Sequence, residues 1–354
     1  MAFPSDLIAF AVALLASLGL TVPVRRMALR FGMVDHPGPR KVHVKPIPLL
    51  GGIAIYLGFI LAFLLTVRDV PEQQILGILA GATLVAVVGI LDDGGLLHHQ
   101  VKLFIGMPVA AFFLVASGIQ AHLFSQFVPG TSGVALDGCL TMLWVVGITA
   151  AFSILDHMDG LCAGIAAVAA VFFTISAILN GQTMVRTLGV AALGAALGFL
   201  CWNFNPAKIF MGDSGAMFLG FLMATLGLKI RPEGAQFPVA WLVPLLILGV
   251  PIFDTTLVSV SRIRRGLLPF TSPGKDHTAH RLSNLGLGHR GAVLVLYLAA
   301  ALSGTLALLI PRLSPWAAYT LGGTVILGGL FAVFLLEAAP YERQDKPDKS
   351  SPAS

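Results

Sequence analysis

Long apolar stretches separated by short polar segments repeat along the chain. A stretch of about 20 apolar residues crosses the hydrocarbon of a bilayer as a helix, and a helix is expected because lipid offers the backbone no hydrogen-bond partner. Eleven spans are predicted, although two are short, so ten is the alternative count. The predicted spans are 7–24, 50–67, 75–91, 103–117, 139–155, 161–180, 187–202, 216–228, 237–260, 292–310 and 316–336.

Composition supports this pattern. Apolar residues make up 56% of the 354 positions and charged residues 11%, whereas soluble proteins carry roughly 25% charged residues. A water-soluble globule, a disordered chain and a disulfide scaffold are therefore excluded, and the three cysteines are interpreted as small apolar residues. We predict an all-α integral membrane protein with one polytopic domain, 1–336, and a polar, disordered cytoplasmic tail, 337–354.

Positive charges set the expected orientation. Alternate loops on one side of the predicted spans hold 17 of the 22 Lys and Arg residues, and that side is expected to be cytoplasmic. The N-terminus is then outside and the C-terminus inside, which requires an odd number of spans. The net charge of +5 reflects this topology, and no nucleic-acid partner is predicted.

Aspartates gather at the predicted cytoplasmic ends of the spans. The chain has 13 Asp and only 4 Glu, whereas general solvation of helix ends predicts a mixture of both. Asp92 and Asp93 are adjacent at a helix C-terminus, where negative charge is unfavourable, so they need a metal ion or Lys102 as partner. Spacing of three places Ser153, Asp156 and Asp159 on one helical face.

Asp213 lies between glycines just before the span 216–228. A carboxylate at a helix N-terminus suits a metal–phosphate contact. The nine histidines show no zinc-like spacing, and oxygen ligands favour Mg²⁺, or Mn²⁺ as the alternative. Asp254 lies late in a span, where it is either functional or a structural hydrogen-bond anchor.

Two cytoplasmic loops are candidates for binding an anion. The loop 261–289 is long enough to suggest function, and topology alone explains Arg262–Arg265 but not His277, His280 and Arg281. The loop 35–52 is rich in Pro, Gly and basic residues, including Lys45, and is expected to form a phosphate-binding rim.

Five sequence blocks, in order, resemble the polyprenyl-phosphate N-acetylhexosamine-1-phosphate transferases of glycosyltransferase family 4, on their WecA/TagO-like branch. The blocks are Val34-Asp-His-Pro with Arg40-Lys-Val-His, Gly89-Ile-Leu-Asp-Asp, Asp156-His-Met-Asp-Gly-Leu, Asn203-Phe-Asn-Pro-Ala-Lys-Ile-Phe-Met-Gly-Asp-Ser-Gly215, and Pro251-Ile-Phe-Asp-Thr with His277-Thr-Ala-His-Arg-Leu.

The resemblance implies a fold, a place and a reaction. It implies a bacterial inner-membrane enzyme with its active site on the cytoplasmic face. A polyprenyl phosphate would attack a UDP-HexNAc donor, by default UDP-GlcNAc, and UMP would leave in a Mg²⁺-dependent reaction. The implied partners are the donor, the lipid acceptor and the bilayer, and relatives can form homodimers.

The resemblance also implies residue roles. Asp213 is the implied metal ligand, with Ser153 beside it, and the remaining roles fall into three groups. Asp92, Asp93, Lys102 and Asp156 are implied to be catalytic, Asp159, Phe210 and Asn203 to bind the nucleotide, and His277, His280 and Arg281, together with Lys45 of the rim, to bind the sugar and its phosphate.

Departures from the family pattern leave two other functions open. In the pattern Asn-x-x-Asn-x-x-Asp-Gly, this chain has Ala150, Ser153, Asp156 and His157, and Ala279 replaces the middle His of a His-x-His-His pattern. A catalytically weak relative that binds prenyl phosphate or UDP-sugar is the first alternative. An ion-coupled transporter is the second, and it predicts charges near the middle of the bilayer.

Overall fold

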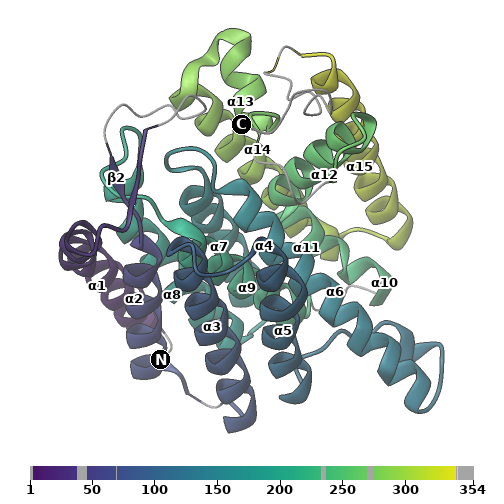
Figure 1. Cartoon of the computed structure of the whole chain (residues 1–354). Helices are drawn as coiled ribbons and strands as arrows, with labels where there is room; N and C mark the ends of the chain where they lie inside the picture. The colour runs from purple at the N-terminus through teal and green to yellow at the C-terminus, as the bar shows by residue number, and fades with distance from the viewer. Residues whose placement is uncertain are drawn as a thin grey trace.

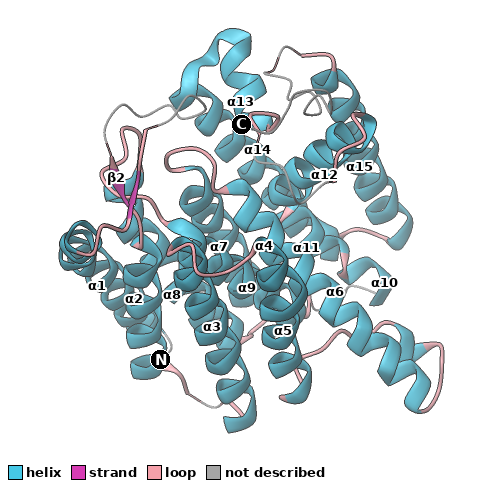
Figure 2. Cartoon of the chain, viewed as in Figure 1, coloured by secondary structure: helices cyan, strands magenta, loops and turns pink. Residues whose placement is uncertain are grey.

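The structure, a computed structural model, describes residues 3–37, 46–68, 70–232, 237–268, 274–339 and 341. It is almost entirely helical, as expected (Figure 2). The main helices of the first part are α1 (Phe3–Arg30), α2 (Gly51–Thr66), α3 (Glu72–Asp93), α4 (His99–Val101), the π-helical turn η1 (Lys102–Gly106), α5 (Met107–Ala116), α6 (Thr131–Leu155), α7 (Leu161–Leu179) and α8 (Thr183–Asn203). They are followed by α9 (Gly212–Lys229), α10 (Phe237–Ala240), α11 (Leu242–Ile247), α12 (Gly249–Arg264), α13 (Thr278–Leu282), η3 (Ser283–Leu287), α14 (Gly288–Leu309) and α15 (Pro315–Glu337), with short 3-10 turns at η2 (Phe124–Gln126) and η4 (Ile310–Arg312).

Seven helices in the described part of the chain are long and apolar enough to cross a membrane. They are α1, α3, α6, α7, α8, the stretch that contains α13 and α14, and α15. The helix α2 and the stretch η1–α5 are apolar but shorter. Every predicted span falls mainly on helix, while the total of eleven and the orientation stay predictions.

The ninth predicted span, 237–260, is corrected by the structure. It is not one helix but the three pieces α10, α11 and α12. Pro244 and Pro251 lie at this broken stretch, and a proline lacks the N–H that an uninterrupted helix requires. The apolar length of this segment was visible in the sequence, and the breaks, at Trp241 and Leu248, lie three residues before Pro244 and Pro251.

Helix α9 forms the centre of the bundle (Figure 1). Every residue from Ser214 to Leu228 is buried, as expected of a helix that is apolar all round. It packs against α2, α3, α6 and α7. Glycines permit the closest approach, because a Cβ on Gly52 would collide with the backbone nitrogen of Gly215.

A small strand pair departs from the all-helical prediction. β1 (Val34–Asp35) pairs antiparallel with β2 (Ile47–Pro48). The carbonyl of Pro48 accepts a hydrogen bond from Phe210 N–H at 2.8 Å, and Gly51 N–H donates to the Phe210 carbonyl at 3.0 Å. The ends of the predicted rim loop therefore hold the segment before α9, while Lys45 lies outside the described residues.

Candidate active site

The N-terminus of α9 is held by a carboxylate from the end of α3. Asp93 accepts hydrogen bonds from the backbone N–H groups of Asp213, at 2.7 Å, and Ser214, at 3.2 Å. These amides would otherwise have no partner at a helix start. Gly212 precedes them with a φ of 71°, and a Cβ there would collide with the Asp93 carboxylate, so this position requires glycine.

Asp213 is the centre of the polar cluster. Lys102 Nζ donates to Asp213 and, at 2.8 Å, to Asp92 Oδ2. Ser153 Oγ donates to Asp213 Oδ1 at 2.5 Å. The structure therefore brings together α3, η1, α6 and α9 at residues that the sequence places up to 121 positions apart.

Asp156 completes the cluster just beyond the end of α6. Its carboxylate accepts a hydrogen bond from the backbone N–H of Gly212, yet burial raises its pKa to about 8, and the negative charges of Asp213 and Asp93 add to the rise. Of the four carboxylates gathered here, those of Asp92 and Asp213 pair with Lys102. This excess of negative charge and the oxygen-rich donors fit a hard divalent cation, which would favour the ionised form of Asp156.

The cluster lies at helix ends. Asp92 and Asp93 end α3, Asp156 follows α6, and Asp213 begins α9. Charges at the ends of spans differ from the midplane charges that the transporter hypothesis predicts.

A cavity of about 500 Å³ opens beside the cluster. Seven of the residues predicted from sequence line it, namely Ser153, Asp156, Asp159, Asn203, Phe210, Asp213 and His280. Residues that sequence reasoning did not select also line it, among them Asp35, Asn205, His157 and His289. Asp35 and Asn205 belong to sequence blocks that carry the family resemblance. Membership in these blocks could have identified both residues as candidates for the cavity lining.

Asp159 and Asn203 shape one wall of the cavity. Asp159 Oδ2 accepts hydrogen bonds from Asn205 Nδ2 at 3.1 Å and from Ala207 N–H at 2.9 Å. Asn203 is 3% exposed, and its amide binds Gly160 N–H and the Ile209 carbonyl, both at 3.0 Å. Both polar atoms of the Asn203 side chain bind backbone groups, and its nucleotide-binding role stays a prediction.

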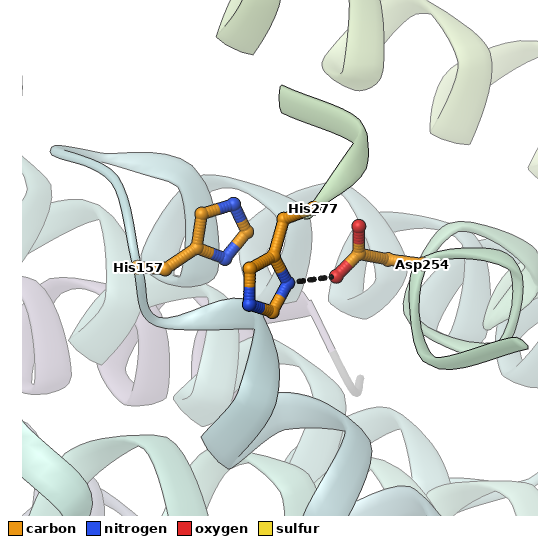
Figure 3. A group of neighbouring side chains, drawn as sticks. All are labelled: His157, Asp254 and His277. Carbon is orange, nitrogen blue, oxygen red and sulfur yellow. Dashed lines mark hydrogen bonds and ion pairs between the residues drawn. The ribbon is translucent and has the colours of Figure 1, made fainter. Parts of the chain in front are cut away.

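His277 lies behind the cavity wall. His277 Nδ1–H donates to Asp254 Oδ2 at 3.0 Å (Figure 3), and Thr278 N–H donates to Asp254 Oδ1 at 2.7 Å. Asp254 is therefore the hydrogen-bond anchor that was one of its two predicted roles. His277 is only 5% exposed, and His157 and His280 rather than His277 line the cavity.

Arg281, which is predicted to bind the sugar and its phosphate, does not line the cavity. Its side chain has no exposed surface, and its guanidinium donates to the carbonyls of Asp276 and Leu336 and to Ser261 Oγ. It also pairs with Glu337 at 3.0 Å. These contacts use the guanidinium within the protein, and the sugar-binding role of Arg281 stays a prediction.

The contacts of Arg281 extend beyond residue 336, the predicted end of the domain. The helix α15 ends at Glu337, one residue beyond the predicted end of the domain, and the Tyr341 ring packs 3.9 Å from the Arg281 guanidinium. The start of the predicted tail is thus part of the fold.

Replacing Arg281 by Met is expected to lower the free energy of unfolding by about 3–5 kcal/mol, since it removes the buried cation that pairs with Glu337 and that donates to the Asp276 and Leu336 carbonyls. Thermal unfolding in detergent measures the change. Arg264→Met, an exposed position on α12, is the control and should shift the midpoint little. Equal midpoints for the two variants would contradict a structural role for Arg281.

Comparison with known proteins places this site in a family. The family model for glycosyl transferase family 4 matches residues 75–231. A probable undecaprenyl-phosphate N-acetylglucosaminyl 1-phosphate transferase of Bacillus subtilis is 37% identical, over 93% of this chain and 88% of that protein. The decaprenyl-phosphate N-acetylglucosaminephosphotransferase of Mycolicibacterium smegmatis is 35% identical, over 78% of this chain and 74% of that protein. The undecaprenyl-phosphate alpha-N-acetylglucosaminyl 1-phosphate transferase of Escherichia coli K12 is 29% identical, over 80% and 78%.

Proposed function

The chain belongs to glycosyl transferase family 4, and we propose that it transfers N-acetylhexosamine 1-phosphate from a UDP-sugar to a polyprenyl phosphate, with release of UMP. GlcNAc is the expected sugar, since the relatives above are named for it. The observation that carries the proposal is the carboxylate cluster at the start of α9, which opens onto the cavity. The excess of Lys and Arg on that side supports a cytoplasmic-facing site in an inner membrane.

The residues at the cluster fit Mg²⁺. Asp213 and Asp156 would hold it, with the Ser153 hydroxyl beside them, and when bound it would offset the charge of the donor pyrophosphate. Phosphoryl transfer depends mainly on positioning and on charge stabilisation. Asp93 fixes the direction of α9 and therefore of Asp213, while Lys102 holds Asp92 beside Asp213.

Surfaces next to the carboxylate cluster suit the nucleoside of the donor and the prenyl chain of the acceptor. Asp159 and Phe210 line the cavity and are proposed to contact the nucleoside. After Lys102, the helix surface exposes Phe104, Ile105 and Phe112. An apolar surface that begins at a lysine suits a lipid phosphate, whose head would lie near Lys102 and whose prenyl chain would follow η1 and α5.

The acceptor requires little activation by a base. The second pKa of a phosphate monoester is about 6, so the nucleophilic oxygen is already largely deprotonated near neutral pH. We therefore assign Asp92 and Lys102 to placing the phosphate rather than to removing a proton from it.

Release of UMP by the purified protein tests the proposal. With undecaprenyl phosphate, a panel of UDP-HexNAc donors and Mg²⁺, UMP should form with one preferred donor. Chelation of the metal ion should abolish release, and excess Mg²⁺ should restore it. Release that persists after chelation would contradict the metal assignment.

A catalytically weak relative is the second candidate. The observation that favours it is Ser153, which stands where the family pattern has an amide. A UDP-sugar that binds without any UMP release would support this candidate and contradict the transferase.

A further inference from the structure

Helix α14 contacts both loops that lie beside Asp159 at the cavity wall. Near the start of α14, the Arg290 Nη2 and Nε groups donate to the backbone carbonyl of Asn205 at 2.8 and 3.1 Å. Two turns later, Tyr297 Oη–H donates to the carbonyl of Gly160 at 2.5 Å. The first contact holds the loop between α8 and α9, and the second holds the loop between α6 and α7.

The same two loops are joined to each other through Asp159. Its Oδ2 atom accepts hydrogen bonds from Asn205 Nδ2 at 3.1 Å and from Ala207 N–H at 2.9 Å. Within the part of the chain that the structure describes, its Oδ1 atom has no hydrogen-bond partner. Because Asp159 lines the cavity, Oδ1 is left to accept a hydrogen bond from a bound molecule.

Arg290 fixes which way the side-chain amide of Asn205 faces. Its Nε group also donates to Asn205 Oδ1, at 3.2 Å. A guanidinium offers only donors and an ionised carboxylate only acceptors, so the amide oxygen must face Arg290 and the amide nitrogen must face Asp159. Without Arg290 the amide is free to turn its oxygen toward Asp159, where two acceptors repel each other. The direction of Asp159 therefore depends on a residue that does not itself line the cavity.

Neither helix stability nor membrane topology accounts for an arginine at this position. Arg290 is the third residue of α14, which begins at Gly288. Positive charge in the first turn of a helix opposes the helix dipole, so the stability of α14 does not favour it. Membrane topology requires only a positive charge, which lysine supplies equally well. The planar array of donors that binds a carbonyl and an amide oxygen together is specific to arginine.

We propose that Arg290 is a positioning residue for the nucleotide-sugar donor, which acts through Asn205 to direct the Asp159 carboxylate at the nucleoside, and that Tyr297 supports the adjoining loop. This inference rests on the proposed function, in which Asp159 contacts the nucleoside. A carboxylate that is already held in place does not have to be ordered when the donor binds, and a smaller ordering cost gives tighter binding. Arg290 therefore contributes to the affinity for the donor rather than to the chemical step.

The test is the KM for the preferred UDP-sugar, measured by UMP release. Arg290→Met retains an apolar stem and loses every donor, so it should raise this KM about three- to tenfold, the scale of one net hydrogen bond. The kcat and the KM for the lipid phosphate should stay near their wild-type values. Arg290→Lys keeps the charge but not the planar array of donors, so its KM should also be raised. Tyr297→Phe should raise the KM in the same direction.

Two comparisons separate positioning from general attraction of an anionic donor. Attraction by an exposed cation weakens as salt is added, so the KM ratio of Arg290→Met to wild type should be the same at low and high ionic strength. In an Asp159→Ala background, Arg290→Met should raise the KM no further, because it acts through that carboxylate. Arg264→Met, which removes an exposed cation outside the cavity, is the control and should retain the wild-type KM.

An unchanged KM in Arg290→Met, full recovery in Arg290→Lys, or a KM ratio that disappears at high salt would overturn this inference and leave the proposed function intact. An equal effect of Arg290→Met with and without Asp159 would do the same. Should the wild type release no UMP from any donor, the proposed function fails by itself. Calorimetry with UMP then decides the inference, since weaker binding by Arg290→Met than by wild type supports it, and equal or undetectable binding by both overturns it.

Discussion

Asp213→Asn is expected to reduce UMP release by about 10²–10³-fold, the scale of losing one fixed electrostatic group at a reacting centre. Asn has nearly the size of Asp and still accepts the hydrogen bond from Ser153, and its backbone N–H still binds Asp93. The fold should therefore persist, while the charge that pairs with Lys102 and that would hold Mg²⁺ is lost.

The control for this variant is Asp6→Asn. Asp6 pairs with Arg186 at 3.0 Å between the start of α1 and α8, so the same chemical change is made away from the cavity. Its UMP release should stay near that of the wild type. Activity of Asp213→Asn within a few-fold of wild type, with a normal unfolding midpoint, would remove Asp213 from the reaction.

Gly212→Ala is expected to lose both stability and activity. A left-handed φ of 71° is strained for alanine, and the new Cβ would displace the Asp93 carboxylate from the start of α9. Together, backbone strain and a lost helix cap predict a loss of about 2–4 kcal/mol in the free energy of unfolding. Displacement of Asp213 by about 1 Å would reduce UMP release about 10²-fold.

Gly118→Ala separates the two causes. Gly118 has a similar φ of 78°, but a Cβ added there would meet no other atom within 4 Å, so this variant carries strain without a collision. Thermal unfolding and UMP release are measured for both. An equal loss in the two variants would show that the contact with Asp93 contributes nothing.

Helix positions were largely predictable because the bilayer limits what an apolar segment can do. Each predicted apolar run lies mainly on helix, since the backbone bonds of a helix need no partner outside the segment. The run 237–260 shows the limit of this reasoning. Mean apolarity predicts one span there, whereas the prolines divide it into α10, α11 and α12.

The chemistry of the site residues could be recognised in the sequence, but the groups that each of them contacts could not. Asp213, Asp156 and Ser153 stand out because carboxylates and a hydroxyl in apolar, glycine-flanked settings need a partner, and the structure brings them to one cavity. Arg281 stands out for the same reason and lies elsewhere. Its charge was visible in the sequence, but its burial against Leu336 and Glu337 depends on how α13 and α15 pack.

The sequence by itself determined that this is a helical membrane protein of the transferase family with its acidic residues at the ends of helices, because hydropathy and residue type are local properties. Only the tertiary structure decided which charged groups meet. Lys102 reaches Asp213, Asp93 holds the first amides of α9, and Asp254 supports the His277 ring under His157. Such pairings join side chains that are distant in the chain, and they depend on helix approach distances that hydropathy does not encode.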